Sequence, residues 1–187
     1  MEQSTKDIDT ELTIDYKTLT FRKALEAMHL DEGHLEFIAM ESKNSAVWSA
    51  LIRRKEATAQ VLSILGEKVS PKDEHLQLAI SSHENVTDDV LRILGEKTKY
   101  PSVFEVIVKN VQDSSWLGDL VDKAKDLDVL QKIASRGDDE IKLIVIRKLN
   151  VKKEGRLIIS IAQMMSSPLS MSLALKLMGE KLDEVEE

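Results

Sequence analysis

The sequence contains no cysteine, and only 4% of its 187 residues are aromatic. Without cysteine the chain has no disulfides, no thiolate nucleophile and no zinc finger. No apolar run approaches the roughly 20 residues that cross a bilayer, and the first 17 residues hold no run suited to a signal peptide. We therefore expect a cytoplasmic protein without a membrane partner.

The net charge of −7 comes from the two ends of the chain. Residues 1–17 carry five acids and two lysines, and residues 179–187 carry five acids and one lysine. Residues 18–178 therefore balance, with 23 acids and 23 bases. The net basic charge that is typical of nucleic-acid binders is missing from the body of the chain.

Motifs that would mark an enzyme or a metal site are also missing. The four histidines form no HExxH, and the chain has no GxxxxGK[ST] or GxGxxG phosphate loop and no GxSxG nucleophile motif. The acidic clusters at 31–32, 88–89 and 138–140 each precede or open an expected helix, where carboxylates interact favourably with the helix dipole. His83, in the turn SHEN, is expected to cap the backbone. We predict no enzyme, no cofactor and no metal.

A nearly exact repeat is the strongest feature of the sequence. VLSILGEK at 61–68 returns 29 residues later as VLRILGEK at 90–97, and GEK appears again at 179–181. Apolar residues recur at almost the same spacing along two tracks offset by half a repeat. The first track is Ile38, Leu65, Leu94, Val121, Leu149 and Leu177, and the second is Ala24, Leu51, Ala79, Ile107, Ala134 and Ala162. Two tracks predict two short elements in each unit.

The expected elements are helices. In TAQVLSILGEK the apolar residues follow helical spacing, and we predict that Gly66 ends the helix, as Gly95 and Gly179 end the corresponding ones. In SPKDEHLQLAIS we predict Ser70 as the N-cap, and in TDDVLRIL we predict Thr87.

These patterns predict an all-α protein, specifically a right-handed α-solenoid of about six two-helix repeats of about 28 residues, over residues 18–180. Each unit has one apolar side that it cannot bury alone, so neighbouring units stack into a continuous core. Residues 1–17 are expected to form an arm that is disordered or caps the first unit. Residues 181–187 are expected to form an acidic tail.

Several segments resemble known helical repeats. LAISSHENVTDDVLRILGEK (78–97) is similar to the variant leucine-rich repeat in its Leu-Ala pair, its His-x-Asn-x-Thr turn and its later Val-Leu. GDDEIKLIVIRKL (137–149) looks like a short HEAT-like unit, with an Asp-rich turn before its second helix. The resemblance covers roughly 150 residues and implies a curved α-solenoid. The four-cysteine iron–sulfur segment found beside some variant repeats is missing, so that cofactor is not implied.

One set of aligned residues is a candidate binding surface. Superposing the second helices of the units places Arg53, Ser81, Lys109, Arg136 and Met164 at equivalent positions. The candidate partner-binding residues are Arg53, Lys109 and Arg136, because a row of cations suits an acidic segment or a phosphate backbone. The alternative is structural, since each cation stands at a helix C-terminus and complements the negative end of the dipole.

Three functions follow from these patterns. The leading one is a non-catalytic protein–protein interaction module, an adaptor, inhibitor or assembly factor that binds a protein along the solenoid surface. The methionines of the last unit, Met164, Met165, Met171 and Met178, suit either core filling or a contact between copies in a homo-oligomer. The second is a HEAT-like solenoid that binds nucleic acid through the basic ladder. The third is a HEAT-like DNA-repair enzyme, for which two Trp, two Tyr and three Phe leave few residues to build an aromatic pocket.

Overall fold

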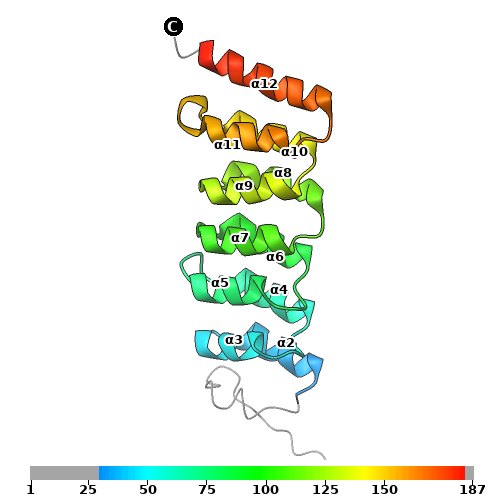
Figure 1. Cartoon of the computed structure of the whole chain (residues 1–187). Helices are drawn as coiled ribbons and strands as arrows, with labels where there is room; N and C mark the ends of the chain where they lie inside the picture. The colour runs from blue at the N-terminus through cyan, green and yellow to red at the C-terminus, as the bar shows by residue number, and fades with distance from the viewer. Residues whose placement is uncertain (1–29, 184–187) are drawn as a thin grey trace, which may run out of the picture.

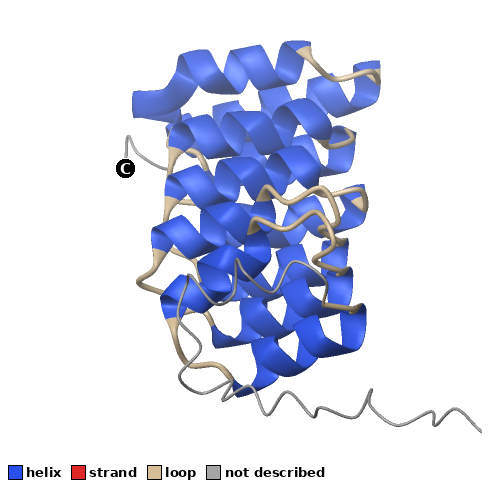
Figure 2. Cartoon of the chain, turned by 90° about the horizontal axis from the view of Figure 1, so that it is seen from below, coloured by secondary structure: helices blue, strands red, loops and turns tan. Residues whose placement is uncertain are grey.

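The computed structural model describes residues 30–183, and helices and their connections account for all of this part of the chain (Figure 2). It contains eleven α-helices and one 3-10 turn, η1, at Ser114–Trp116. The helices are α2 (Glu32–Glu41), α3 (Ser45–Ile52), α4 (Ala59–Lys68), α5 (Glu74–Ser81), α6 (Asp88–Lys97), α7 (Pro101–Asn110), α8 (Leu117–Lys123), α9 (Leu127–Arg136), α10 (Asp139–Lys148), α11 (Val151–Gln163) and α12 (Pro168–Asp183). The all-α prediction is confirmed for these residues.

The helices are stacked in two layers (Figure 1). We call α2, α4, α6, α8 and α10 the first layer, and α3, α5, α7, α9 and α11 the second layer. Almost every helix packs against the helix two places further along the chain, and α12 closes the stack by packing on both α10 and α11. This sequential packing is consistent with a helical repeat.

A continuous apolar core runs between the layers. In α6, for example, Val90, Leu91 and Leu94 are spaced so that all three face inward, and each is at most 1% exposed. Members of both predicted tracks lie in this core: Ile38, Leu51, Leu65, Leu94, Ile107, Val121, Ala134, Leu149 and Ala162. Full burial of a side chain of this size stabilises the fold by about 1.5–3 kcal/mol, so the stacking of neighbouring helices supplies much of the stability.

The glycines of the GEK tripeptides do not end their helices, and that prediction was wrong. Both α4 and α6 continue beyond Gly66 and Gly95, and Gly179 lies inside α12. Glycine is favoured at position 95 because of close packing, since an added Cβ would lie 3.1 Å from the indole of Trp116. The glycine therefore gives a neighbouring side chain room to approach the helix.

One N-cap prediction was wrong and one is confirmed. The N-cap of α5 is Asp73, not Ser70, and its carboxylate accepts a hydrogen bond from the amide of Leu76 at 3.1 Å. An aspartate that bonds the first turn directly outcompetes a serine placed three residues earlier. Thr87 is the N-cap of α6, as predicted, although its side chain makes no capping hydrogen bond.

Some predictions fall outside the described residues. These are the arm at 1–17, the first part of the predicted solenoid at 18–29, which includes Ala24 of the second track, and the last part of the acidic tail at 184–187. Within residues 30–183, no helix combines the length and the apolar character needed to cross a membrane.

Candidate functional site

Lysines at the ends of first-layer helices bind the preceding helix of that layer. The Lys97 ammonium, at the end of α6, donates to the carbonyl oxygens of Gly66 and Glu67 in α4 at 2.7 and 3.0 Å. The corresponding bonds at α4 and α10 run from Lys68 to Ala39 and Met40, and from Lys148 to Val121 and Asp122. The last carbonyls of a helix have no hydrogen-bond donor within the helix, and they lie at the negative end of its dipole. Each ammonium supplies the missing donor and a positive charge that interacts favourably with the dipole. We call this contact the lysine clamp.

The clamp lysines had a signal in the sequence that was not interpreted correctly. Lys68 and Lys97 are the last letters of the repeated GEK, and each lysine binds carbonyl oxygens near the end of the preceding first-layer helix. Desolvation in the contact lowers the pKa of Lys68 and of Lys148 below the usual value for lysine.

A related contact links helices of the second layer. Arg136, the last residue of α9, donates through Nη2 to the carbonyl of Val111 at 2.8 Å and through Nη1 to that of Val108. Asn110, the last residue of α7, donates through Nδ2 to the carbonyl of Ser81 at 2.7 Å. Asn110 is therefore the counterpart of Arg136 in the stack, and Lys109 lies one position before it.

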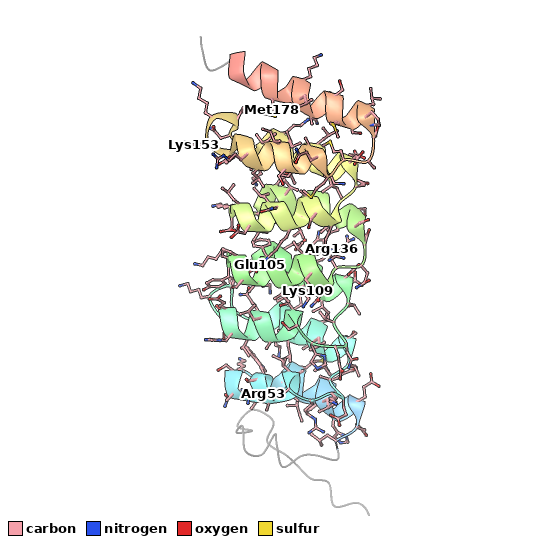
Figure 3. The ribbon with its side chains drawn as sticks, in the orientation of Figure 1. Arg53, Glu105, Lys109, Arg136, Lys153 and Met178 are labelled. Carbon is pink, nitrogen blue, oxygen red and sulfur yellow. The ribbon has the colours of Figure 1, made fainter. Side chains whose placement is uncertain are left out.

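The structure brings two of the three candidate binding residues together. Lys109 and Arg136 lie near each other on α7 and α9, and they line one shallow pocket of about 280 Å³ (Figure 3). Arg53, the exposed C-cap residue of α3, lies further along the second layer, with α5 between it and α7. The pocket is thus a smaller candidate site than a ladder along the whole layer.

The pocket between α7 and α9 combines apolar and charged groups. Its lining residues are Glu105, Val106, Val108, Lys109, Lys132, Ser135 and Arg136. At one edge, the Lys132 ammonium pairs with the Glu105 carboxylate at 2.6 Å and bridges the two helices. Since the Arg136 guanidinium is bound to carbonyls, Lys109 is the lining cation without a hydrogen-bond or ion-pair partner among the described residues. It is the cation most available to a ligand.

His83 binds the backbone, as predicted. Nε2 of His83 lies 3.0 Å from the carbonyl oxygen of Arg54, and its Nδ1 accepts from the amide of Asn85. Asp31 and Asp138 are the N-caps of α2 and α10. Within residues 30–183, no three His, Asp or Glu side chains are grouped so that they could hold a metal ion.

Asp139, in the first turn of α10, anchors the start of α12. Its carboxylate accepts from the amides of Ser166 and Ser167 at 3.0 and 2.9 Å and lies 3.4 Å from the Lys142 ammonium. The two amide hydrogen bonds are the main cause of a pKa lowered to about 2. The same hydrogen bonds stabilise the charged carboxylate and hold the connection between α11 and α12 against α10.

Comparisons with models of protein families, with curated proteins and with solved structures find no match for this chain. Its function must therefore be inferred from the two layers and their pockets.

Proposed function

We propose that the chain is a non-catalytic protein–protein interaction module, an adaptor, inhibitor or assembly factor, and that its helices form a right-handed α-solenoid of two-helix units. The spacing of the clamps supports the repeat, because their hydrogen bonds join residues 26 to 31 positions apart, close to the period of the sequence. Stacked units of this kind offer an extended surface to a partner.

The observation that carries the proposal is the unpaired Lys109 beside the apolar wall of its pocket. Val106 is half-buried and gives an apolar contact, while the Lys109 ammonium stands exposed next to it. A partner segment with an acidic side chain next to an apolar one matches both groups. The Glu105–Lys132 ion pair forms a polar rim, as at many protein interfaces.

The disposition of the cations favours a protein over a nucleic acid. Binding along a phosphate backbone needs many cations that are free to pair with phosphates. Among the bases of this chain, Lys68, Lys97, Arg136 and Lys148 are bound to carbonyls of the chain itself. One cation beside an apolar wall suits a single acidic side chain better than a run of phosphates.

The test is capture of partners from lysate of the source cells, with and without nuclease treatment, by the wild-type protein and two charge-reversal variants. Lys109→Glu changes the pocket, and Lys152→Glu, in the first turn of α11, makes the same charge change at an exposed site elsewhere. We do not use Arg136→Glu, because it would break contacts within the fold.

The proposal predicts a protein that is captured by the wild type and by Lys152→Glu and is lost with Lys109→Glu. Equal capture by all three forms would show that the pocket between α7 and α9 is not the binding site. Loss of the captured protein on nuclease treatment, with a steep dependence on salt, would support the nucleic-acid alternative instead.

A further inference from the structure

The first layer is interrupted between α6 and α8. Every other pair of consecutive helices in either layer packs with its backbones close together, whereas the backbones of α6 and α8 stay further apart and the helices meet through side chains, including Leu120 of α8 against Gly95. Lys123 ends α8 immediately before its C-cap, which is the position that Lys68, Lys97 and Lys148 occupy in their helices. Unlike them, Lys123 has no hydrogen-bond or ion-pair partner among the described residues. The lysine clamp is therefore open at this junction.

Trp116 explains why the junction is open. Its indole is 5% exposed and lies against Gly95 on α6, where an added Cβ would come within 3.1 Å of the ring. The Arg92 guanidinium lies 5.4 Å from the ring centroid and pairs with Asp113 at 2.8 Å, which fixes the segment that carries the indole. A side chain of this size between α6 and α8 holds their backbones apart, and the ends of the two helices leave a space.

That space is a pocket of about 380 Å³, a volume suited to a small ligand or a single side chain. Gly95 and Glu96, whose carbonyls an ordinary clamp would bind, line it together with Lys123. The other lining residues are Thr98, Lys99, Pro101, Phe104, Ala124, Lys125, Asp126 and Val129. The pocket thus lies where α6 and α8 end and α7 and α9 begin, and it shares no lining residue with the pocket that contains Lys109.

The charges around the pocket favour an anion. Three lysines line the pocket, Lys99, Lys123 and Lys125, against two acids, Glu96 and Asp126. The Asp126 carboxylate is already engaged as the N-cap of α9, where it accepts from the amides of Asp128 and Val129. Three ammonium groups repel a cationic ligand, so a basic side chain would not replace the missing clamp. The aromatic ring of Phe104 and the side chain of Val129 add an apolar wall.

We propose that this pocket binds a phosphate group, carried by a small phosphate monoester or by a phosphorylated side chain of a protein. A phosphate group has close to two negative charges and three acceptor oxygens at neutral pH, which matches several lysines better than a carboxylate with one charge does. Lysine binds phosphate as a point charge and needs no fixed fork geometry, so exposed lysines around an opening suffice to hold it. The apolar wall accommodates the carbon atoms of the ester. This inference does not depend on the proposed protein-binding function.

The experiment is a titration of the full chain, labelled with ¹⁵N, with inorganic phosphate, phenyl phosphate, and a short phosphoserine peptide beside its unphosphorylated form. Sodium chloride keeps the ionic strength constant, so that a general salt effect does not change the spectra. Two double variants are compared: Lys123→Gln with Lys125→Gln, and, as the charge-matched control, Lys152→Gln with Lys153→Gln. The single Lys125→Gln variant is included because Lys125 lies in the connection and not in a helix.

Saturable shifts of the amides of Gly95, Glu96, Lys99 and Lys125 are expected for the phosphates and not for the unphosphorylated peptide. The Lys123/Lys125 variant should weaken binding by at least about tenfold, as expected for loss of two charge-assisted contacts, and the control should leave it unchanged. Tighter binding of the peptide than of phenyl phosphate indicates a protein source, and the reverse order indicates a small molecule. Shifts that do not saturate, or that the control variant reduces equally, would overturn the proposal.

Discussion

Removing a clamp lysine should destabilise the fold. The same substitution at the open junction, where the lysine makes no clamp bonds, serves as the control. We consider Lys97→Met, which keeps most of the aliphatic side chain and removes the ammonium that binds Gly66 and Glu67. Lys123→Met makes the identical change at the equivalent position of α8, where no such bonds exist.

The size of the effect follows from the bonds that are lost. A hydrogen bond to a charged group contributes about 1.5–3 kcal/mol net, and a cation at a helix C-terminus contributes about 0.3–1 kcal/mol. Lys97 is half-buried, and holding its long side chain in place costs up to about 2 kcal/mol of entropy. We therefore expect a loss of about 1–2 kcal/mol, or about 2–8 °C in Tm for a domain of this size.

The assay is thermal and urea unfolding followed by far-UV circular dichroism, with both variants measured beside the wild type. Lys97→Met should lower the midpoints, and Lys123→Met should stay within about 0.5 kcal/mol of the wild type, as a surface substitution does. If both substitutions lower the free energy of unfolding by the same small amount, the clamp hydrogen bonds would add nothing to the interaction of a lysine with the dipole of its own helix. If instead both substitutions lower the stability by the full amount of about 1–2 kcal/mol, Lys123 is bound in solution, which would remove the basis for the phosphate site.

Three further results are expected. Gly66→Ala should stabilise α4 by about 0.5–1 kcal/mol, because its nearest neighbour leaves room at 3.6 Å, whereas Gly95→Ala should destabilise the fold by contact with Trp116; equal midpoints in urea would contradict this reasoning. Arg136→Met should lower Tm and Lys109→Met should not, since only the arginine is bound to neighbouring carbonyls; a Tm lowered by both would argue against an available Lys109. The pKa of Asp139 is lowered to about 2, below its unfolded value of about 3.9, so its contribution to stability should be full above about pH 4 and lost as the pH falls through 2. An NMR titration of that carboxyl with a midpoint near 4 would refute the assignment, and Asp139→Asn should remove the corresponding part of the acid dependence of Tm.

The sequence predicts the helices, their spacing and the buried tracks, because these depend on the periodicity of apolar residues along a helix. The N-cap of α5 was misplaced because Ser70 and Asp73 both satisfy the local rule, and only the course of the chain decides between them. The role of Gly95 was missed for a related reason. A glycine that admits a neighbouring indole and a glycine that ends a helix look alike until the neighbour is known.

The candidate site was predicted less well, since side-chain partners depend on contacts between units. Aligning the sequence by steps of 28, 28 and 27 residues placed Arg53, Ser81, Lys109 and Arg136 at equivalent positions. The hydrogen bonds instead make Asn110, which binds the preceding helix, the equivalent of Arg136. The units differ in length, and η1 with the short α8 takes the place of a regular ten-residue helix, so a fixed period drifts by a residue. The pocket at the open clamp requires Trp116 to be placed against Gly95, which no local pattern indicates.

The wide spacing of α6 and α8 also bears on how the stack comes apart. In a linear array, cooperativity passes from neighbour to neighbour through each interface, and the weakest interface divides the array into units that open separately. Here α7 and α9 pack with their backbones close together, whereas α6 and α8 are joined through side chains, with Trp116 and Leu120 against Gly95. Native-state hydrogen exchange should therefore report two protection levels, with helices before η1 in one group and helices after it in the other.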